Sequence, residues 1–194
     1  QGETEHLSYR AEVWHLTDPA RTGEIASCVP PGARLLDYVE YALDVPLMFR
    51  IVGDEYVVAH GISFREILER GRWPEGTELT LDDIWNQLGA IFTKARLKKG
   101  LVELRSTDGQ RPQDVSAIPA FWVGLLYDAQ ARAAALDLLG GLPGRSEMAR
   151  LVPRLGLEAE WDGRPLSELA LDLLAMAKGG LERRISAGDE VPES

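Results

Sequence analysis

LVELRSTDG (residues 101–109) and the apolar run AIPAFWVGLLYD (residues 117–128) that soon follows it decide the expected fold of this chain. We predict a strand over Leu101–Ser106, which puts Glu103 and Arg105 on one face because side chains two residues apart point the same way. A carboxylate and a guanidinium aimed together into a cleft can hold a divalent cation and the phosphate oxygens that it bridges. An exposed cross-strand ion pair is the alternative reading of the same spacing.

Turn residues and hydrophobic periodicity predict the other elements of the chain. We expect strands at Ala11–Leu16, Leu47–Val52 and Glu55–Ala59, and helices at Leu35–Leu43, from Ser63 to near Gly71, from Thr80 to about Lys94, at Ala117–Leu139 and from Leu166 to about Ile185. Strands and helices do not alternate as βαβ units, which favours the α+β class, an antiparallel sheet with packed helices. No repeat or linker divides the chain, so we expect residues 1–194 to form a single region, with a disordered tail over residues 186–194.

Composition limits the partners that this chain can bind. A formal net charge of -10 argues against a general nucleic-acid surface or an anionic-membrane surface, so phosphate binding would have to be local. Cys28 is the only cysteine, which excludes an internal disulfide and suits a reducing compartment. No apolar run is long enough to span a membrane and no charged-then-apolar leader is present, so we expect a cytoplasmic location.

Five collinear segments carry a resemblance to a known family. They are SYRAEVWHLTDPARTG from Ser8, YVEYALDVPLMF from Tyr38, GISFREIL from Gly61, VELRSTDG from Val102 and IPAFWVGLLYD from Ile118. In this order and spacing the chain resembles the glutamate–cysteine ligases of the plant and proteobacterial type, over most of residues 8–139 and more weakly in the last helix. The resemblance implies the C-terminal part of a glutamine-synthetase-like fold. It also implies an ATP- and magnesium-dependent ligase that joins the side-chain carboxylate of glutamate to cysteine through a γ-glutamyl phosphate, the first step of glutathione-type thiol synthesis.

The resemblance assigns roles on the substrate side. Arg10 would grip the substrate glutamate's carboxylate through a bidentate guanidinium, and Trp14 would form a wall of the substrate pocket. Arg21 would either bind substrate or tie its own turn by hydrogen bonds to carbonyls. Met48 stands where relatives often carry a tyrosine in the substrate pocket, which puts the identity of the amine acceptor in question.

On the cofactor side, the resemblance turns the first motif into a nucleotide site. Glu103 would be a magnesium ligand and would bind ATP through that ion. Arg105 would bind the ATP phosphates and act in catalysis. Arg96 would contribute a further cofactor contact, for which Lys98 or Lys99 are alternatives because the preceding loop departs from the family pattern.

The resemblance also implies that most of the magnesium and ATP ligands lie in a segment that precedes the SYRAEVW motif in such ligases. We therefore expect a partial enzyme that needs a missing N-terminal segment or a companion chain as its partner. Two alternatives remain open. One is a non-catalytic module that binds a small metabolite or a partner chain, and the other is a glutamate–amine ligase with another acceptor.

Overall fold

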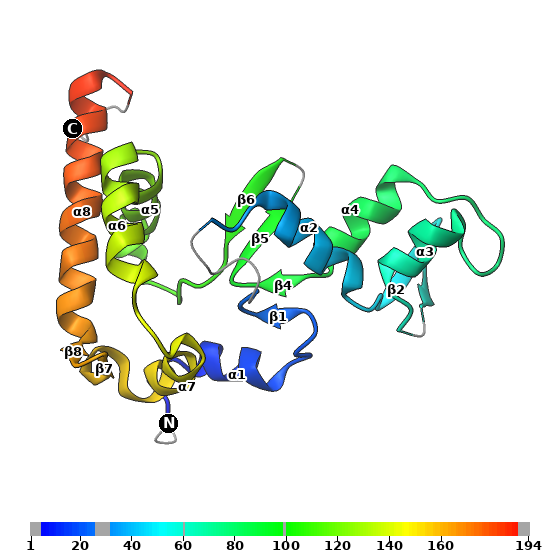
Figure 1. The fold of residues 1–194 in the computed structure, drawn as a ribbon, viewed down its shortest axis with the longest axis horizontal. Helices are drawn as coiled ribbons and strands as arrows, with labels where there is room; N and C mark the ends of the chain where they lie inside the picture. The colour runs from blue at the N-terminus through cyan, green and yellow to red at the C-terminus, as the bar shows by residue number, and fades with distance from the viewer. Residues whose placement is uncertain (1–4, 26–31, 60, 99, 190–194) are drawn as a thin grey trace. The chain divides into compact units, whose positions relative to one another are not determined.

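The computed structural model describes residues 5–25, 32–59, 61–98 and 100–189 (Figure 1). The chain, expected as a single region, divides into two compact units: a helical unit of Gln1–Glu12 with Thr107–Ser194, and a mixed unit of Val13–Ser106. Helix α1 (Tyr9–Leu16) begins in the helical unit and ends in the mixed unit. Cys28, Lys99 and residues 190–194 of the expected tail lie outside the described residues.

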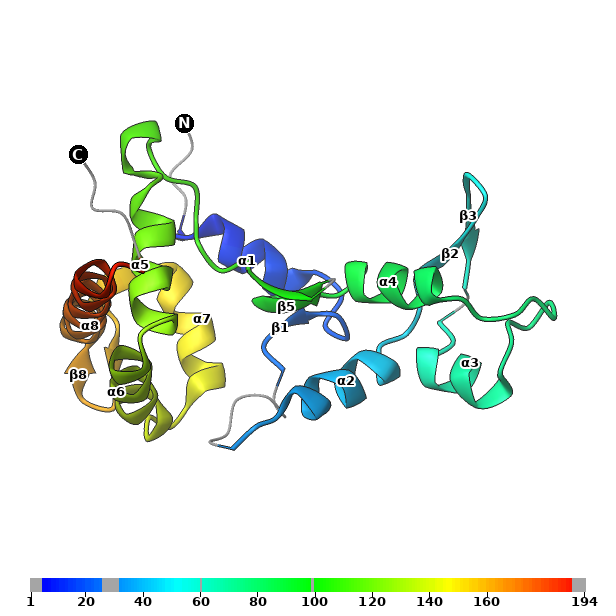
Figure 2. The ribbon, with the colours of Figure 1, turned by 90° about the horizontal axis from the view of Figure 1, so that it is seen from above.

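The mixed unit alternates short helices with hairpins. In chain order its elements are β1 (Thr22–Gly23), α2 (Leu35–Asp44), β2 (Phe49–Val52), β3 (Glu55–Val58), α3 (Phe64–Arg70), α4 (Leu81–Gly89), β4 (Phe92–Thr93), β5 (Ala95–Lys98) and β6 (Leu101–Leu104). β2 pairs with β3 and β5 pairs with β6, both antiparallel, whereas β1 pairs with β4 in parallel. The β2–β3 hairpin packs on α4 through β2 (Figure 2).

Capping residues explain why the helices of the mixed unit begin and end where they do. The hydroxyls of Ser63 and Thr80 accept hydrogen bonds from the backbone N–H groups of Glu66 and Asp83, whose carboxylates bond back to the cap residues' N–H groups. These are the capping boxes of α3 and α4. Helix α3 stops at Gly71, whose φ of 69° favours glycine.

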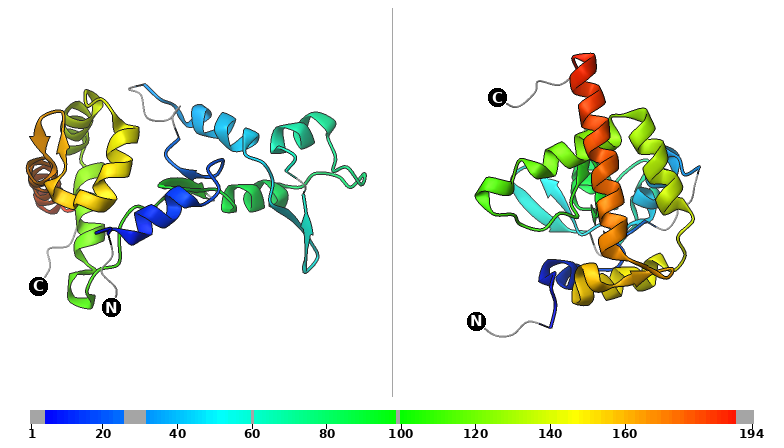
Figure 3. Two further views of the ribbon diagram at one scale, coloured as in Figure 1. Left: turned by 90° about the horizontal axis from the view of Figure 1, so that it is seen from below. Right: turned by 90° about the vertical axis from the view of Figure 1, so that its left-hand side faces the viewer.

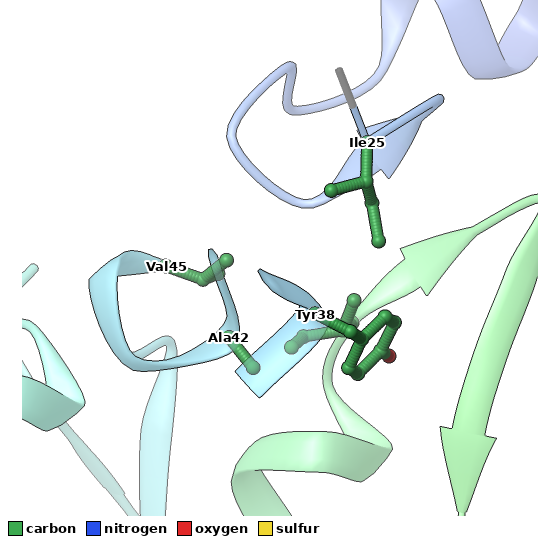
Figure 4. Packing of buried hydrophobic residues seen from close by; sticks show 5 residues of the cluster. Ile25, Tyr38, Ala42 and Val45 are labelled. Carbon is green, nitrogen blue, oxygen red and sulfur yellow. The ribbon is translucent and has the colours of Figure 1, made fainter. Parts of the chain in front are cut away.

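Two small cores hold the mixed unit. The first gathers Ile25, Tyr38, Ala42 and Val45 around the fully buried Ile91 (Figure 4). The second gathers Leu47, Phe64, Ile67 and Trp73. Helix α2 thus packs toward the β1–β4 pair, while α3 packs against α2.

The helical unit is a bundle with one short hairpin. Its elements after α1 are the 3-10 turn η2 (Pro112–Asp114), α5 (Ala117–Leu126), α6 (Ala129–Gly140), α7 (Arg145–Leu155), the 3-10 turn η3 (Gly156–Glu158), β7 (Glu160–Trp161), β8 (Arg164–Pro165) and α8 (Leu166–Ala187). Helix α8 runs along α5 and α6 (Figure 3). Leu125, Ala135 and Ala177 form the buried centre of this bundle.

Glycines allow α5 and α8 to cross closely. A Cβ added at Gly124 would lie 2.0 Å from the carbonyl oxygen of Ala177, and one added at Gly180 would lie 2.0 Å from the carbonyl oxygen of Gly124. The two backbones therefore touch where both helices lack a side chain.

The α+β class is confirmed, but the sheet differs from the prediction. Instead of one antiparallel sheet, the described residues form four two-stranded sheets, one of them the parallel β1–β4 pair. The prediction of a strand at Ala11–Leu16 is wrong, because this segment belongs to helix α1. The hydroxyl of Ser8 accepts a hydrogen bond from the N–H of Ala11, and this cap favours the helix over a weakly alternating strand.

Three other boundaries differ from expectation. Helix α4 ends at Gly89 rather than near Lys94, because the next residues pair with β1 and with β6. The single helix expected over Ala117–Leu139 is two helices, since the carboxylate of Asp128 accepts a hydrogen bond from Ala131 N–H and starts α6. Helix α8 reaches Ala187, two residues into the expected tail.

Candidate functional site

Arg96 and Glu103 face each other across the β5–β6 hairpin. They are direct register partners, and the side chain of Arg96 is buried. Its Nε donates to Glu103 Oε2 at 2.7 Å, and its Nη2 lies 2.5 Å from the same oxygen. The cross-strand ion pair that the spacing left open is therefore real, but its cationic partner comes from the neighbouring strand and is buried.

The Nη1 of Arg96 binds the C-terminal end of α4, the helix that precedes β4 and β5 in the chain. Its Nη1 donates to the carbonyl oxygens of Gly89 at 2.8 Å and Ile91 at 3.2 Å. These carbonyls lie at and just beyond the C-terminus of α4, where a cation is favoured by the helix dipole. Arg96 is thus committed to packing and orientation, which leaves little of its guanidinium for an ATP phosphate.

Arg105 is the second cation on Glu103. Its Nη1 lies 3.6 Å from Glu103 Oε2, and its guanidinium lies 5.5 Å from the ring centroids of both Trp14 and Phe92. The two rings stack on each other with centroids 5.9 Å apart. Trp14 therefore belongs to this cluster as a wall for Arg105, and the aromatic faces fix where the guanidinium points.

The charges around Glu103 keep it ionised. Its partial burial opposes ionisation, but the hydrogen bond from Arg96 and the positive charges of Arg96, Arg105 and Lys98 outweigh that effect and hold the pKa of Glu103 below its usual value. A carboxylate held ionised between two guanidinium groups can orient both of them.

Arg21 ties the turn after α1 to the rest of the mixed unit. Its Nε donates to Asp18 Oδ2 at 2.5 Å, and its Nη2 donates to the carbonyl of Pro46 at 2.7 Å. Its Nη1 donates to the carbonyl of Ala90 at 3.4 Å. Arg21 is buried and donates to carbonyls. These are the contacts expected if Arg21 ties its own turn, which was the alternative to substrate binding.

Met48 lines a cavity of about 820 Å³ in the mixed unit. Phe92 lines the same cavity, so the cavity adjoins the Arg105 cluster through a shared ring. Arg10 lies on α1 in the helical unit, directly before the segment that was expected to be a strand. The structure thus brings together Trp14, Arg96, Glu103 and Arg105, and it puts Met48 at the adjoining cavity.

The residues of this cluster fit a phosphate better than a metal ion. Mg²⁺ prefers six oxygen ligands, whereas the cluster offers one carboxylate that two guanidinium groups already engage. Among the described residues, no three His, Cys, Asp or Glu side chains are grouped to hold a metal ion. Arg105, with its planar fork and partial exposure, suits an anionic oxygen.

Sequence reasoning missed two parts of this site. Phe92 falls inside the helix expected from Thr80 to about Lys94, but it lies on β4, where its ring stacks on Trp14 and faces the guanidinium of Arg105. Arg50 was not singled out, yet it is a buried cation on β2 that lines the cavity. A charged residue in the middle of an otherwise apolar strand was the signal that could have revealed Arg50.

Comparison with known proteins places this chain in a class of ligases. The model of the glutamate-cysteine ligase family 2 (GCS2) matches residues 1–191. The chain belongs to this family.

No helix among the described residues is long and apolar enough to cross a membrane.

Relatives named glutamate–cysteine ligase, chloroplastic, show the extent of the match. The chain is 40% identical to that of Brassica juncea over 182 residues, which are 92% of this chain and 35% of the relative. It is 39% identical to that of Arabidopsis thaliana over 196 residues, which are 95% of this chain and 37% of the relative. The chain therefore spans little more than a third of the length of these relatives.

Proposed function

We propose that this chain supplies part of the catalytic site of an ATP- and magnesium-dependent glutamate–cysteine ligase with a glutamine-synthetase-like fold. Membership of the GCS2 family supports the ligase class and a place in glutathione biosynthesis. The observation that carries the site assignment is the guanidinium of Arg105, held between the carboxylate of Glu103 and the rings of Trp14 and Phe92.

In the proposed reaction, the side-chain carboxylate of glutamate attacks the γ-phosphorus of ATP and forms γ-glutamyl phosphate and ADP. The amine of cysteine then attacks the acyl carbon and expels phosphate. Arg105 would neutralise charge that develops on the transferred phosphoryl group, because preorganised cations stabilise such charge most where water is excluded. Arg10 would orient the glutamate.

Glu103 has a different proposed role from that of a metal ligand alone. Because two guanidinium groups engage its carboxylate, we assign it first to positioning Arg105 and only second to magnesium. Bound magnesium would screen the charges of ATP, and its remaining ligands would come from outside the described residues.

The proposed partner is a segment that corresponds to the unmatched two thirds of the relatives. It would supply most metal and nucleotide ligands, either as part of the same polypeptide or as a companion chain. We therefore expect the 194 residues alone to form no γ-glutamylcysteine.

A chimera tests the function directly. In the Brassica juncea ligase, the matched 182 residues would be replaced by those of this chain, and the product would be measured by mass spectrometry together with ADP release. We expect γ-glutamyl product and ADP in equal amounts. A matched control is Lys178→Gln, an exposed substitution on α8, which should leave turnover unchanged. A folded chimera that produces neither ADP nor product would contradict the proposal.

A further inference from the structure

The cavity beside Met48 has charges that no proposed step of the ligase uses. Its lining contains two cationic side chains, Arg50 and Lys98, and two anionic ones, Asp82 and Asp83. Equal numbers of opposite charges around one cavity suit a ligand that itself carries one charge of each sign.

Arg50 is buried, and its guanidinium has an N–H group that donates to no acceptor in the described part of the chain. Its guanidinium stacks on Trp73 at 4.4 Å from the ring centroid, and its Nη1 donates to Glu75. Its Nε is buried with no hydrogen-bond partner among the described residues, and the nearest carboxylate oxygen, Oδ1 of Asp83, is 3.5 Å away. The guanidinium is thus not fully satisfied by its partners, and because Arg50 lines the cavity its charge favours an incoming carboxylate there.

The two aspartates differ in what they can offer a ligand. Asp83 is buried, accepts hydrogen bonds from Thr80 and from the indole of Trp73, and lies beside Arg50. Asp82 is the exposed neighbour in the first turn of α4 and lines the same cavity. Asp82 is therefore the carboxylate at which a ligand's ammonium group can bind.

The rest of the wall is apolar and aromatic. It includes Met48, Phe49, Tyr56, Trp85 and Phe92. Met48, Tyr56 and Trp85 are substantially exposed, so a ligand that covered them would remove apolar surface from water. A volume of about 820 Å³ is in the range of small-molecule sites and leaves room for a large side chain.

We propose that this cavity binds a zwitterionic α-amino acid with a large apolar side chain. The carboxylate meets the guanidinium of Arg50, the ammonium meets Asp82, and the side chain lies against Trp85 and Tyr56. The inference rests on the proposed function only in one respect: the bound amine would be an acceptor in the ligase reaction.

Calorimetry on the 194-residue chain tests the binding site without any turnover. The probes are L-phenylalanine, L-alanine, N-acetyl-L-phenylalanine, which lacks the ammonium charge, and phenethylamine, which lacks the carboxylate. We expect L-alanine to bind at least about 10-fold more weakly than L-phenylalanine, because it has little side chain to bury. Each of the two analogues that lack one charge should bind about 2- to 5-fold more weakly or worse.

Variants locate the site. Asp82→Asn should abolish the preference for L-phenylalanine over its N-acetyl analogue while leaving helix α4 capped by Thr80. Lys178→Gln on α8 is the control and should leave every affinity unchanged. Equal affinity for L-phenylalanine and both analogues would overturn the zwitterion site, as would no binding of L-phenylalanine or an unchanged preference in Asp82→Asn.

The chimera separates this inference from the proposed ligase. Product from L-phenylalanine as well as from cysteine supports the acceptor role. Product from cysteine alone overturns that role. If no amine gives product while the binding pattern persists, the proposed function fails and the amino-acid site stands.

Discussion

The close crossing of α5 and α8 gives a sharp prediction about stability. In Gly124→Ala the new methyl would lie 2.0 Å from the carbonyl oxygen of Ala177 and 3.2 Å from Cβ of Leu181. An ordinary carbon–oxygen contact is about 3.3 Å, so the helices would have to separate by roughly 1 Å. The obstructing atom belongs to the backbone of a 22-residue helix, so no side-chain rotation relieves the clash.

The magnitude follows from two opposing terms. Overpacking of a close contact costs about 1–3 kcal/mol, and the upper part of this range applies because the obstacle is backbone. Replacing a helical glycine by alanine stabilises the folded helix by about 1 kcal/mol, because alanine has the higher helix propensity. We expect Gly124→Ala to lower the free energy of unfolding by about 2 kcal/mol, or about 4–8 °C in melting temperature for a chain of this size.

Gly179→Ala is the control on α8, the helix whose backbone Gly124 of α5 touches. Its Cβ would meet only Nη1 of Arg183, at 3.4 Å, so the propensity term should act alone. This variant should be more stable than the parent by about 0.5–1 kcal/mol. Thermal and urea unfolding followed by far-ultraviolet circular dichroism would measure both. A Gly124→Ala protein that unfolds at or above the parent's midpoint would refute the reasoning about the crossing.

Three further predictions concern charge, catalysis and capping. In the chimera, Arg105→Lys should lower kcat by about 10²-fold. Glu103→Gln should also lower kcat, and excess magnesium should not restore it, because the role proposed for Glu103 is first to orient Arg105. Full rescue by magnesium would instead mark Glu103 as a metal ligand. Hydrogen bonds from Arg183 and from Ala131 N–H lower the pKa of Asp128 from 3.8 to about 2, so its stabilising contribution is present above pH 3.8 and is lost as the pH falls toward 2. The free energy of unfolding, measured by urea unfolding at a series of pH values, should therefore change less with pH in this window for Asp128→Asn than for the parent. Thr80→Ala should destabilise the chain by about 1 kcal/mol in urea unfolding, whereas Thr80→Ser should not.

Local signals in the sequence predicted the elements that local chemistry determines. The strands expected at Leu47–Val52 and Glu55–Ala59, which form a hairpin across Gly53-Asp54, and the helices expected from Ser63 and Thr80 are confirmed, because turn and cap residues act on their immediate neighbours. The parallel pairing of β1 with β4 was not predicted. It joins Thr22 to Phe92, and such distant pairing leaves no periodic mark on either two-residue strand.

The candidate site was predicted in part for the same reason. Glu103 and Arg105 were found because a strand expected over Leu101–Ser106 puts them on one face; β6 ends at Leu104, and Arg105 follows it directly. The partner of Glu103 was not recognised as Arg96, since strand β5 had not been predicted and only the hairpin register places the two opposite each other. The role of Arg105 in phosphate binding stays a prediction.

Two buried arginines hold the end of helix α4 from different parts of the chain, and this bears on how the protein opens. Arg96 binds the carbonyls of Gly89 and Ile91, and Arg21 binds that of Ala90. Fraying of this helix end would break contacts with the turn after α1 and with the β5–β6 hairpin at once. Amide hydrogens from α4 through β6 should therefore exchange with solvent as one cooperative unit, although these elements are short and lie in separate sheets.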